Sequence, residues 1–224
     1  MLGKLGAELI GTAAFVFFGF GAAVLFGEAI GPVGVAIAFG LAYGAAMWAV
    51  GPVSGGHLNP AVSLGMALAG RIRLRKFVGY AVVQVLGAAL GVWLLHLVLA
   101  GGPQPAAAAD KPLQGFGEGF GGTYGTNAAF AFVAVAAVAF VAAWMIAVRD
   151  DWPSTAACAI AATVLAVLGV FGADITETSV NPALSAGLAM VAGETQGLWL
   201  VAAAPLLGGG LAGLAFAFGL LRTR

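Results

Sequence analysis

Six apolar runs in this sequence are each about as long as a helix that crosses a lipid bilayer. They cover roughly residues 9–26, 32–50, 77–99, 127–148, 155–171 and 198–221. A helix needs about 20 residues to span the roughly 30 Å hydrocarbon layer. Only 8% of the residues are charged and 62% are hydrophobic, whereas a soluble domain is about a quarter charged. The sequence therefore predicts an all-α integral membrane protein, with the first run interpreted as a span rather than a signal peptide.

Two further apolar segments are too short to cross the bilayer. One lies at residues 60–69, after the second span, and the other at residues 182–192, after the fifth. About ten helical residues extend about 15 Å, which is half of the hydrocarbon thickness. We expect each segment to enter the membrane halfway as a re-entrant half-helix, so that the pair together makes one span.

The two halves of the chain repeat each other. Residues 57–63 (His-Leu-Asn-Pro-Ala-Val-Ser) parallel residues 179–185 (Ser-Val-Asn-Pro-Ala-Leu-Ser), 122 positions later, and a Gly-x-x-x-Gly pair recurs at the same offset. Each half contains three spans, so the second half is inverted relative to the first and the half-helices enter from opposite faces. The predicted organisation is a first repeat at 1–105, an external linker at 106–125 and a second repeat at 126–224.

Each short segment begins with the residues Asn-Pro-Ala, which favour the start of a helix. Asn is a preferred N-cap, and Pro fits the first helical position because its φ is already set. Entering from opposite faces, the two helix starts meet near the midplane, each with a partial positive charge and an amide donor. Non-helical backbone at that depth must line a wet cavity or be buried in protein. The sequence predicts a polar pore; the alternative is that Asn-Pro only caps two re-entrant segments in a closed bundle. The pore residues are Asn59, Pro60, Ala61, Asn181, Pro182 and Ala183.

Charge and composition exclude several classes of function. Of the nine Lys and Arg residues, eight fall on one side of this topology and only Lys111 on the other, which predicts that both termini are cytoplasmic in a plasma or inner membrane. The formal net charge is zero without a basic run, which argues against nucleic acid as a partner. We find no nucleophile with a nearby His and acid, no metal-ligand cluster and no phosphate loop. We therefore expect neither an enzyme nor a cofactor or metal site.

These motifs resemble those of the aquaporin and aquaglyceroporin family, also known as the major intrinsic proteins, over essentially the whole chain. The resemblance rests on residues 54–62, on residues 178–183, on Glu8 in the first span and on residues 205–210. It implies six transmembrane helices plus two half-helices, a pore in each subunit and a homotetramer in the lipid bilayer. It also implies that Asn59 and Asn181 donate hydrogen bonds to passing water or a small neutral solute, which turns the molecule so that it does not relay a proton.

The resemblance further implies a narrow outer filter at four positions, counted from the two Asn-Pro-Ala boxes. These positions hold Phe39, Gly169, Thr178 and Leu184. Most members have Arg after the second box, so this chain is an atypical member, lacking five donors and a fixed charge. With Gly169 opposite Leu184, we expect a wider and more apolar filter. Glycerol, urea, ammonia or a neutral metalloid hydroxide would then compete with water.

Support for the pore is also predicted from this resemblance. Glu8 would accept hydrogen bonds from the first re-entrant loop, and His57 would expose a carbonyl to the pore. The equivalent glutamate in the fourth span is missing, because residues 130–141 contain no polar residue. Trp144 falls near a predicted span end, where an interfacial anchor is the usual role.

Other functions remain open at this point. A pore without the filter Arg would leak protons or cations, and a non-conducting scaffold would have the same fold. A proton-coupled secondary transporter also uses inverted repeats and broken helices. Such a transporter needs ionisable residues at the midplane, and Glu8 is the one candidate that the sequence offers.

Overall fold

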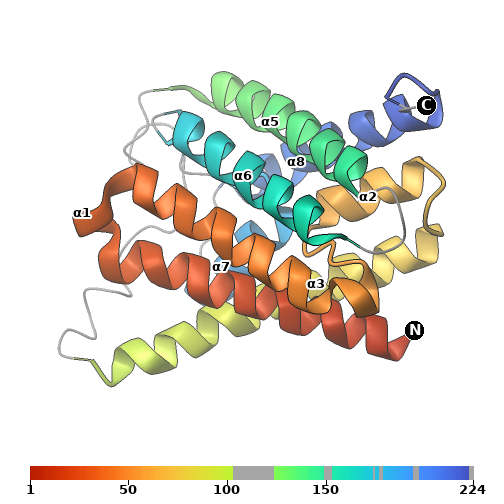
Figure 1. Cartoon of the computed structure of the whole chain (residues 1–224). Helices are drawn as coiled ribbons and strands as arrows, with labels where there is room; N and C mark the ends of the chain where they lie inside the picture. Colours follow the sequence, from red (N-terminus) through yellow and green to blue (C-terminus); the bar gives the residue numbers. More distant parts are fainter. Residues whose placement is uncertain (103–123, 149–152, 174, 177–178, 194–196, 222–224) are drawn as a thin grey trace.

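The computed structural model describes residues 1–102, 124–148, 153–173, 175–176, 179–193 and 197–221. These residues form helices and loops without a strand (Figure 1). The helices are α1 (Leu2–Ser54), α2 (Pro60–Leu68), α3 (Leu74–Ala100), α5 (Thr126–Ala147), α6 (Thr155–Gly172), α7 (Pro182–Ala192) and α8 (Leu198–Ala217). Five of the described helices are long and apolar enough to cross a membrane, while α2 and α7 are short.

Helix α1 provides two of the six spans. Its backbone breaks at Gly31, where φ is 63° and ψ is 178°, a left-handed φ that glycine adopts at little cost. Pro32 follows directly and disfavours helical geometry in the residue before it. Figure 1 shows the two legs of α1 running side by side in opposite directions from this break. The fold is therefore six transmembrane helices plus two half-helices, as the sequence predicted.

The packing of the helices shows the inverted repeat. Helix α1 packs on α3 as α5 packs on α8, and α3 packs on α7 as α2 packs on α8. Glycines allow the long helices to approach the half-helices closely. A Cβ at Gly209 or Gly213 of α8 would collide with the carbonyl oxygen of Ala61 or Gly65 in α2. Each half-helix is therefore held closely against a long helix of the other half, α2 against α8 and α7 against α3.

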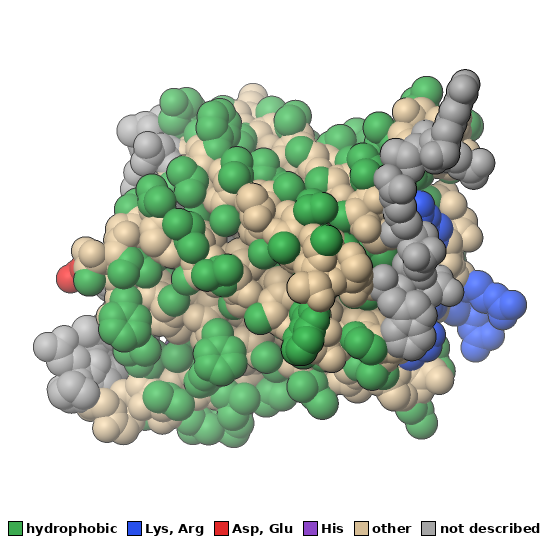
Figure 2. Space-filling view, viewed as in Figure 1, with side chains coloured by type: hydrophobic (Ala, Val, Ile, Leu, Met, Phe, Trp, Pro, Cys, Tyr) green, Lys and Arg blue, Asp and Glu red, His purple; other side chains and the backbone are tan. Residues whose placement is uncertain are grey.

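The described charges separate along the axis of the bundle. Lys and Arg side chains gather at one end (Figure 2), the end at which Figure 1 places the N-terminus and the last turns of α8. The described cations are Lys4, Arg71, Arg73, Arg75 and Lys76. The predicted linker at 106–125 lies outside the described residues except for its last two positions, which lead into α5.

Candidate pore site

The two half-helices begin at the asparagines that the sequence predicted as N-caps. Asn59 Oδ1 accepts a hydrogen bond from the Ala61 amide at 2.7 Å, and Asn181 Oδ1 accepts one from the Ala183 amide at 3.0 Å. Both asparagines have extended backbone angles, and a proline occupies the first turn of each helix. The caps fix the side-chain oxygens toward their own helices, so each amide nitrogen points away from its helix.

The two tips meet and bind each other's loops. Asn59 Nδ2 donates to the Val180 carbonyl at 3.2 Å, and Asn181 Nδ2 donates to the Leu58 carbonyl at 2.9 Å. An Asn amide carries two N–H donors, so each of these bonds leaves one donor. Both side chains are nearly inaccessible, with Asn59 exposed by 1% and Asn181 by 2%. The two half-helices thus converge in the structure, with both asparagine side chains buried between them.

A buried carboxylate holds the first re-entrant loop. Glu8 of α1 accepts hydrogen bonds from the backbone amide of His57 at 3.0 Å and from that of Leu58 at 2.7 Å. Gln84 Nε2 of α3 donates to the same carboxylate at 2.7 Å. Leu58 itself has a φ of 51°, a strained value for a residue with a Cβ. The three donors satisfy both carboxylate oxygens and support that strained loop.

Sequence reasoning missed Gln84, although a signal for it was available. A polar amide in the middle of a membrane span needs a partner inside the protein. Gln84 is fully buried in α3. Besides Glu8, its Nε2 contacts the Ser63 hydroxyl at 3.2 Å, and Ser63 in turn lies 3.0 Å from His57 Nδ1. The first loop is therefore embedded in a network of four polar side chains.

The second re-entrant loop has no such network among the described residues. At the offset of 122 positions, Glu8 corresponds to Phe130 and Gln84 to Leu206. The loop is held instead by the Asn59 amide on the Val180 carbonyl and by the Ser179 hydroxyl, which accepts the Asn181 amide at 3.1 Å. The equivalent of Ser63 is Ser185, whose buried hydroxyl has no hydrogen-bond partner in the part of the chain that the structure describes.

An outer cavity brings together three of the four predicted filter residues. It encloses about 540 Å³ and is lined mainly by apolar side chains, among them Phe39, Gly169 and Leu184. Thr178, the fourth position, lies outside the described residues. Leu184 is only 2% exposed, so it faces the interior rather than lipid. The cavity also reaches Val180, whose carbonyl accepts the Asn59 amide. A role of these residues in selecting solutes stays a prediction.

The surroundings of Gly169 bear on its predicted role. A Cβ built on Gly169 would lie 3.0 Å from Ala36 Cβ, so a side chain at this position would first meet α1. Between the two legs of α1, Gly19 leaves room for the Phe39 ring, because a Cβ on Gly19 would lie 2.7 Å from that ring. The absence of a side chain at Gly169 thus allows α6 to pack on α1, independently of any effect on the width of the filter.

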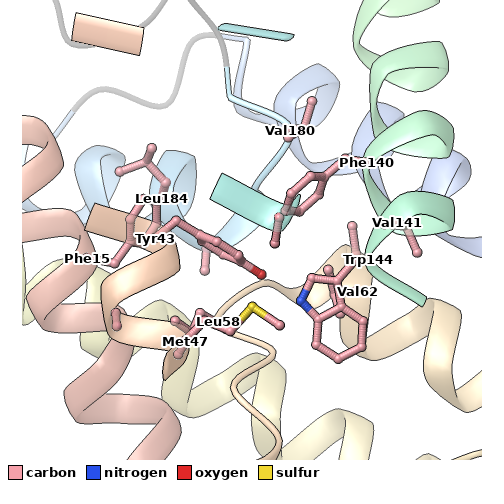
Figure 3. Close-up of a cluster of buried hydrophobic side chains, with 14 of the residues drawn as sticks. Phe15, Tyr43, Met47, Leu58, Val62, Phe140, Val141, Trp144, Val180 and Leu184 are labelled. Carbon is pink, nitrogen blue, oxygen red and sulfur yellow. The ribbon is translucent and has the colours of Figure 1, made fainter. Parts of the chain in front are cut away.

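An aromatic row lies at the inner end of the outer cavity. The ring of Tyr43 packs edge-to-face on Phe15, with centroids 5.4 Å apart, and on Phe140, with centroids 5.5 Å apart. Figure 3 shows Tyr43 at the centre of this group, between Phe15 and Leu184 on one side and Phe140 on the other. The Tyr43 hydroxyl donates to the His57 carbonyl at 2.7 Å. The carbonyl that we expected to face the pore is therefore engaged by Tyr43 in this structure.

The predicted position of Trp144 at a membrane interface is wrong. Its side chain is buried, and its ring packs edge-to-face on the His57 ring with centroids 5.2 Å apart. The first re-entrant loop covers this end of α5, which removes Trp144 from the surface. Its indole N–H lacks a partner among the described residues.

Comparisons with known proteins agree with this architecture. An aquaporin Z from Rhodopseudomonas palustris is 38% identical over 219 residues, which cover 95% of this chain and 91% of the relative. An aquaporin Z from Brucella melitensis is also 38% identical, over 214 residues and 93% of each chain.

Solved structures show the same fold at low sequence identity. The aquaglyceroporin from Plasmodium falciparum superposes with a TM-score of 0.80 at 17% identity, over 99% of this chain and 96% of that one. A channel described as an FNT family ion channel superposes with a TM-score of 0.59, also at 17% identity, over 98% of this chain and 89% of that one. The sequence itself matches the major intrinsic protein family over residues 1–216. The chain belongs to the major intrinsic protein family.

Proposed function

We propose that this chain is a passive transmembrane channel for water and small uncharged solutes. The observation that carries the proposal is the meeting of two oppositely inserted half-helices, with Asn59 and Asn181 at their tips, beside an outer cavity of about 540 Å³. Relatives with 38% identity over nearly the whole chain are water-channel proteins by name. Transport through such a site makes and breaks no covalent bond, so the protein is a channel and not an enzyme.

The asparagine tips supply the chemistry of selection. Each amide has a second N–H donor that can turn toward the oxygen of a passing water or hydroxyl. The positive ends of the two helix dipoles converge at the same point and disfavour cations there. A water or hydroxyl oxygen that accepts hydrogen bonds from the two asparagines is held in one orientation. Molecules therefore pass this point one at a time.

The outer filter favours neutral solutes over strict water selection. Leu184 stands where most members carry Arg and offers neither charge nor hydrogen bonds, and Phe39 adds an apolar wall. Glycerol, urea, ammonia and neutral metalloid hydroxides therefore enter the cavity without having to pass the charged side chain of an Arg. Together with Thr178 and Gly169, these residues are our proposed filter.

The same site argues against a proton-coupled transporter. Within the described spans, Glu8 is the buried acid, and three donors at 2.7–3.0 Å engage both of its oxygens. A carboxylate that carries a proton across the membrane must give up such partners in each cycle. We assign Glu8 to the support of the loop.

The assembly and orientation follow the family resemblance. We propose a homotetramer with a pore in each subunit, inserted in a plasma or inner membrane with both termini in the cytoplasm. The positive-inside rule supports this orientation, because the described cations share the end of the molecule that carries the N-terminus.

Stopped-flow light scattering on proteoliposomes tests the function directly. Water, glycerol, urea and arsenous acid gradients are applied in parallel to the parent protein, to Leu184→Arg and to empty vesicles. A channel gives flux above empty vesicles that rises linearly with the solute gradient, and Leu184→Arg lowers solute flux more than water flux. Saturating flux that collapses with the proton gradient indicates a transporter. Water flux equal to that of empty vesicles contradicts the proposal, and an acid-sensitive dye reports proton leak in the same vesicles.

A further inference from the structure

Tyr43 lies directly inward of the proposed outer filter. It is four residues after Phe39 in α1, so both side chains project from the same face of the helix, one turn apart. Phe39 and Phe15 line the outer cavity, and Phe15 in turn packs on Tyr43. A molecule that passes the outer filter and moves toward the asparagine tips therefore meets the Tyr43 ring.

The row of rings reaches from one half of the protein to the other. Phe15 and Tyr43 belong to the two legs of α1, while Phe140 belongs to α5 in the second repeat. The interplanar angles are 86° between Phe15 and Tyr43 and 73° between Tyr43 and Phe140, which are edge-to-face contacts that favour both pairs. Tyr43 is 1% exposed and Phe140 is fully buried. The three rings therefore fill the space between the two halves at this level.

Polar atoms lie at the inner edge of this row. The Tyr43 hydroxyl donates to the His57 carbonyl, and the indole nitrogen of Trp144 lies on the facing side of the same space (Figure 3). Trp144 is almost completely buried, yet its N–H has no acceptor among the described residues. A buried N–H without a partner is unfavourable, so the arrangement suits a small molecule whose oxygen accepts from Trp144.

We propose that Tyr43 determines how fast the solutes that enter the outer cavity reach the asparagine tips, by forming an inner constriction that slows molecules of three or more heavy atoms in a chain relative to water. This inference rests on the proposed channel function and makes it more specific. A passing water replaces the Tyr43 hydroxyl on the His57 carbonyl after a small rotation of the ring. Glycerol enters the outer cavity but passes only if the ring leaves both edge-to-face contacts.

Two substitutions separate the hydroxyl from the ring. Tyr43→Phe keeps the ring and frees the His57 carbonyl, so water permeability rises by between about twofold and about tenfold, the equivalent of one neutral hydrogen bond, while glycerol permeability stays at the parent value. Tyr43→Leu removes the ring, so glycerol and urea permeability rise by at least about tenfold, the equivalent of losing more than one edge-to-face contact.

Tyr80→Phe is the matched control. The Tyr80 hydroxyl is also buried and also donates to a backbone carbonyl of the same region, that of Ser54, at 2.6 Å. Tyr80 belongs to α3, and its ring packs edge-to-face on the His57 ring rather than on the aromatic row. We expect Tyr80→Phe to leave the ratio of glycerol to water permeability at the parent value.

Stopped-flow light scattering with each variant decides the matter, with the amount of protein per vesicle measured and folding checked by size-exclusion chromatography and circular dichroism. If the parent conducts water and Tyr43→Leu leaves the glycerol-to-water ratio unchanged, the inner constriction is refuted while the channel function stands. If the Tyr80 variant changes the ratio as much as Tyr43→Leu, a general effect on the loop replaces our explanation and the inference is also refuted. If the parent is closed to water and Tyr43→Leu conducts, Tyr43 occludes the pore instead of letting water pass, and the inference is refuted. If neither conducts, the proposed function itself fails.

Discussion

Replacing Glu8 by Gln tests the buried network that holds the first re-entrant loop. The carboxylate accepts three N–H groups, at 3.0 Å from His57 and at 2.7 Å from both Leu58 and Gln84. Glutamine keeps the shape but turns one oxygen into a donor. In its better orientation the His57 amide loses its acceptor, which costs about 1–3 kcal/mol, and the two remaining bonds lose the help of a charge. We expect the free energy of unfolding to fall by about 2–4 kcal/mol.

The measurement is an SDS titration of the purified protein in mixed micelles, followed by helical circular dichroism. Lys4→Gln serves as the control, because Lys4 is an exposed charged residue one turn before Glu8 in α1, and we expect it to change the free energy by no more than about 0.5 kcal/mol. Water permeability of the Glu8 variant should fall as well, since the loop that carries Asn59 loosens. A Glu8→Gln protein as stable as the parent would refute the network as the support of the loop.

Three further predictions concern the two equivalent serines, the two asparagines and Gly169. Ser63→Ala lowers the free energy of unfolding by about 1–3 kcal/mol because its hydroxyl hydrogen-bonds the Asn59 carbonyl and lies beside His57 Nδ1. Ser185→Ala is neutral or stabilising because its hydroxyl has no partner among the described residues; SDS titration measures both, and equal losses contradict the assignment. Asn59→Ala changes solute selectivity and stability more than Asn181→Ala, measured by light scattering and SDS titration, because the second loop depends on the Asn59 amide; a larger effect of Asn181→Ala contradicts this. Gly169→Ala strains the contact with the facing alanine of α1 and lowers glycerol permeability less than Leu184→Arg does; an equal or larger fall in glycerol flux shows instead that this glycine sets the filter width.

The half-helices were predictable because their signals are local. Asn followed by Pro specifies a cap and a first turn within three residues, and the structure begins α2 and α7 at Pro60 and Pro182 as expected. The break at Gly31 is also a local Gly-Pro signal between two apolar runs. The number of spans was predictable as well, because a helix needs about 20 residues to cross the hydrocarbon layer and each of the six apolar runs is about that long.

The aromatic row was not predictable in the same way. A soluble helix shows which face is buried through its apolar stripe, but the faces of a membrane helix are apolar toward lipid and toward protein alike. Tyr43, Phe140 and Trp144 therefore could not be assigned to the interior by pattern. The usable signal was chemical, because the Tyr43 hydroxyl and the Trp144 indole carry polar atoms that need partners inside a span. Counting residues from the second Asn-Pro-Ala box likewise located Gly169. It could not show that Ala36 of α1 lies where a side chain at Gly169 would be.

The two halves of the repeat divide the work unequally. In the first half a carboxylate in α1 binds the loop, so the Asn181 amide that reaches the Leu58 carbonyl adds to a loop already held by Glu8. In the second half α5 offers no acid, and the Asn59 amide is a main support of the Val180 carbonyl. A side-chain amide that holds a loop by one hydrogen bond cannot turn to donate to a solute without weakening its hold on the loop. Asn59 is therefore more constrained than Asn181, and movement of the second loop, which carries Leu184 behind it, is coupled to occupancy of the asparagine site.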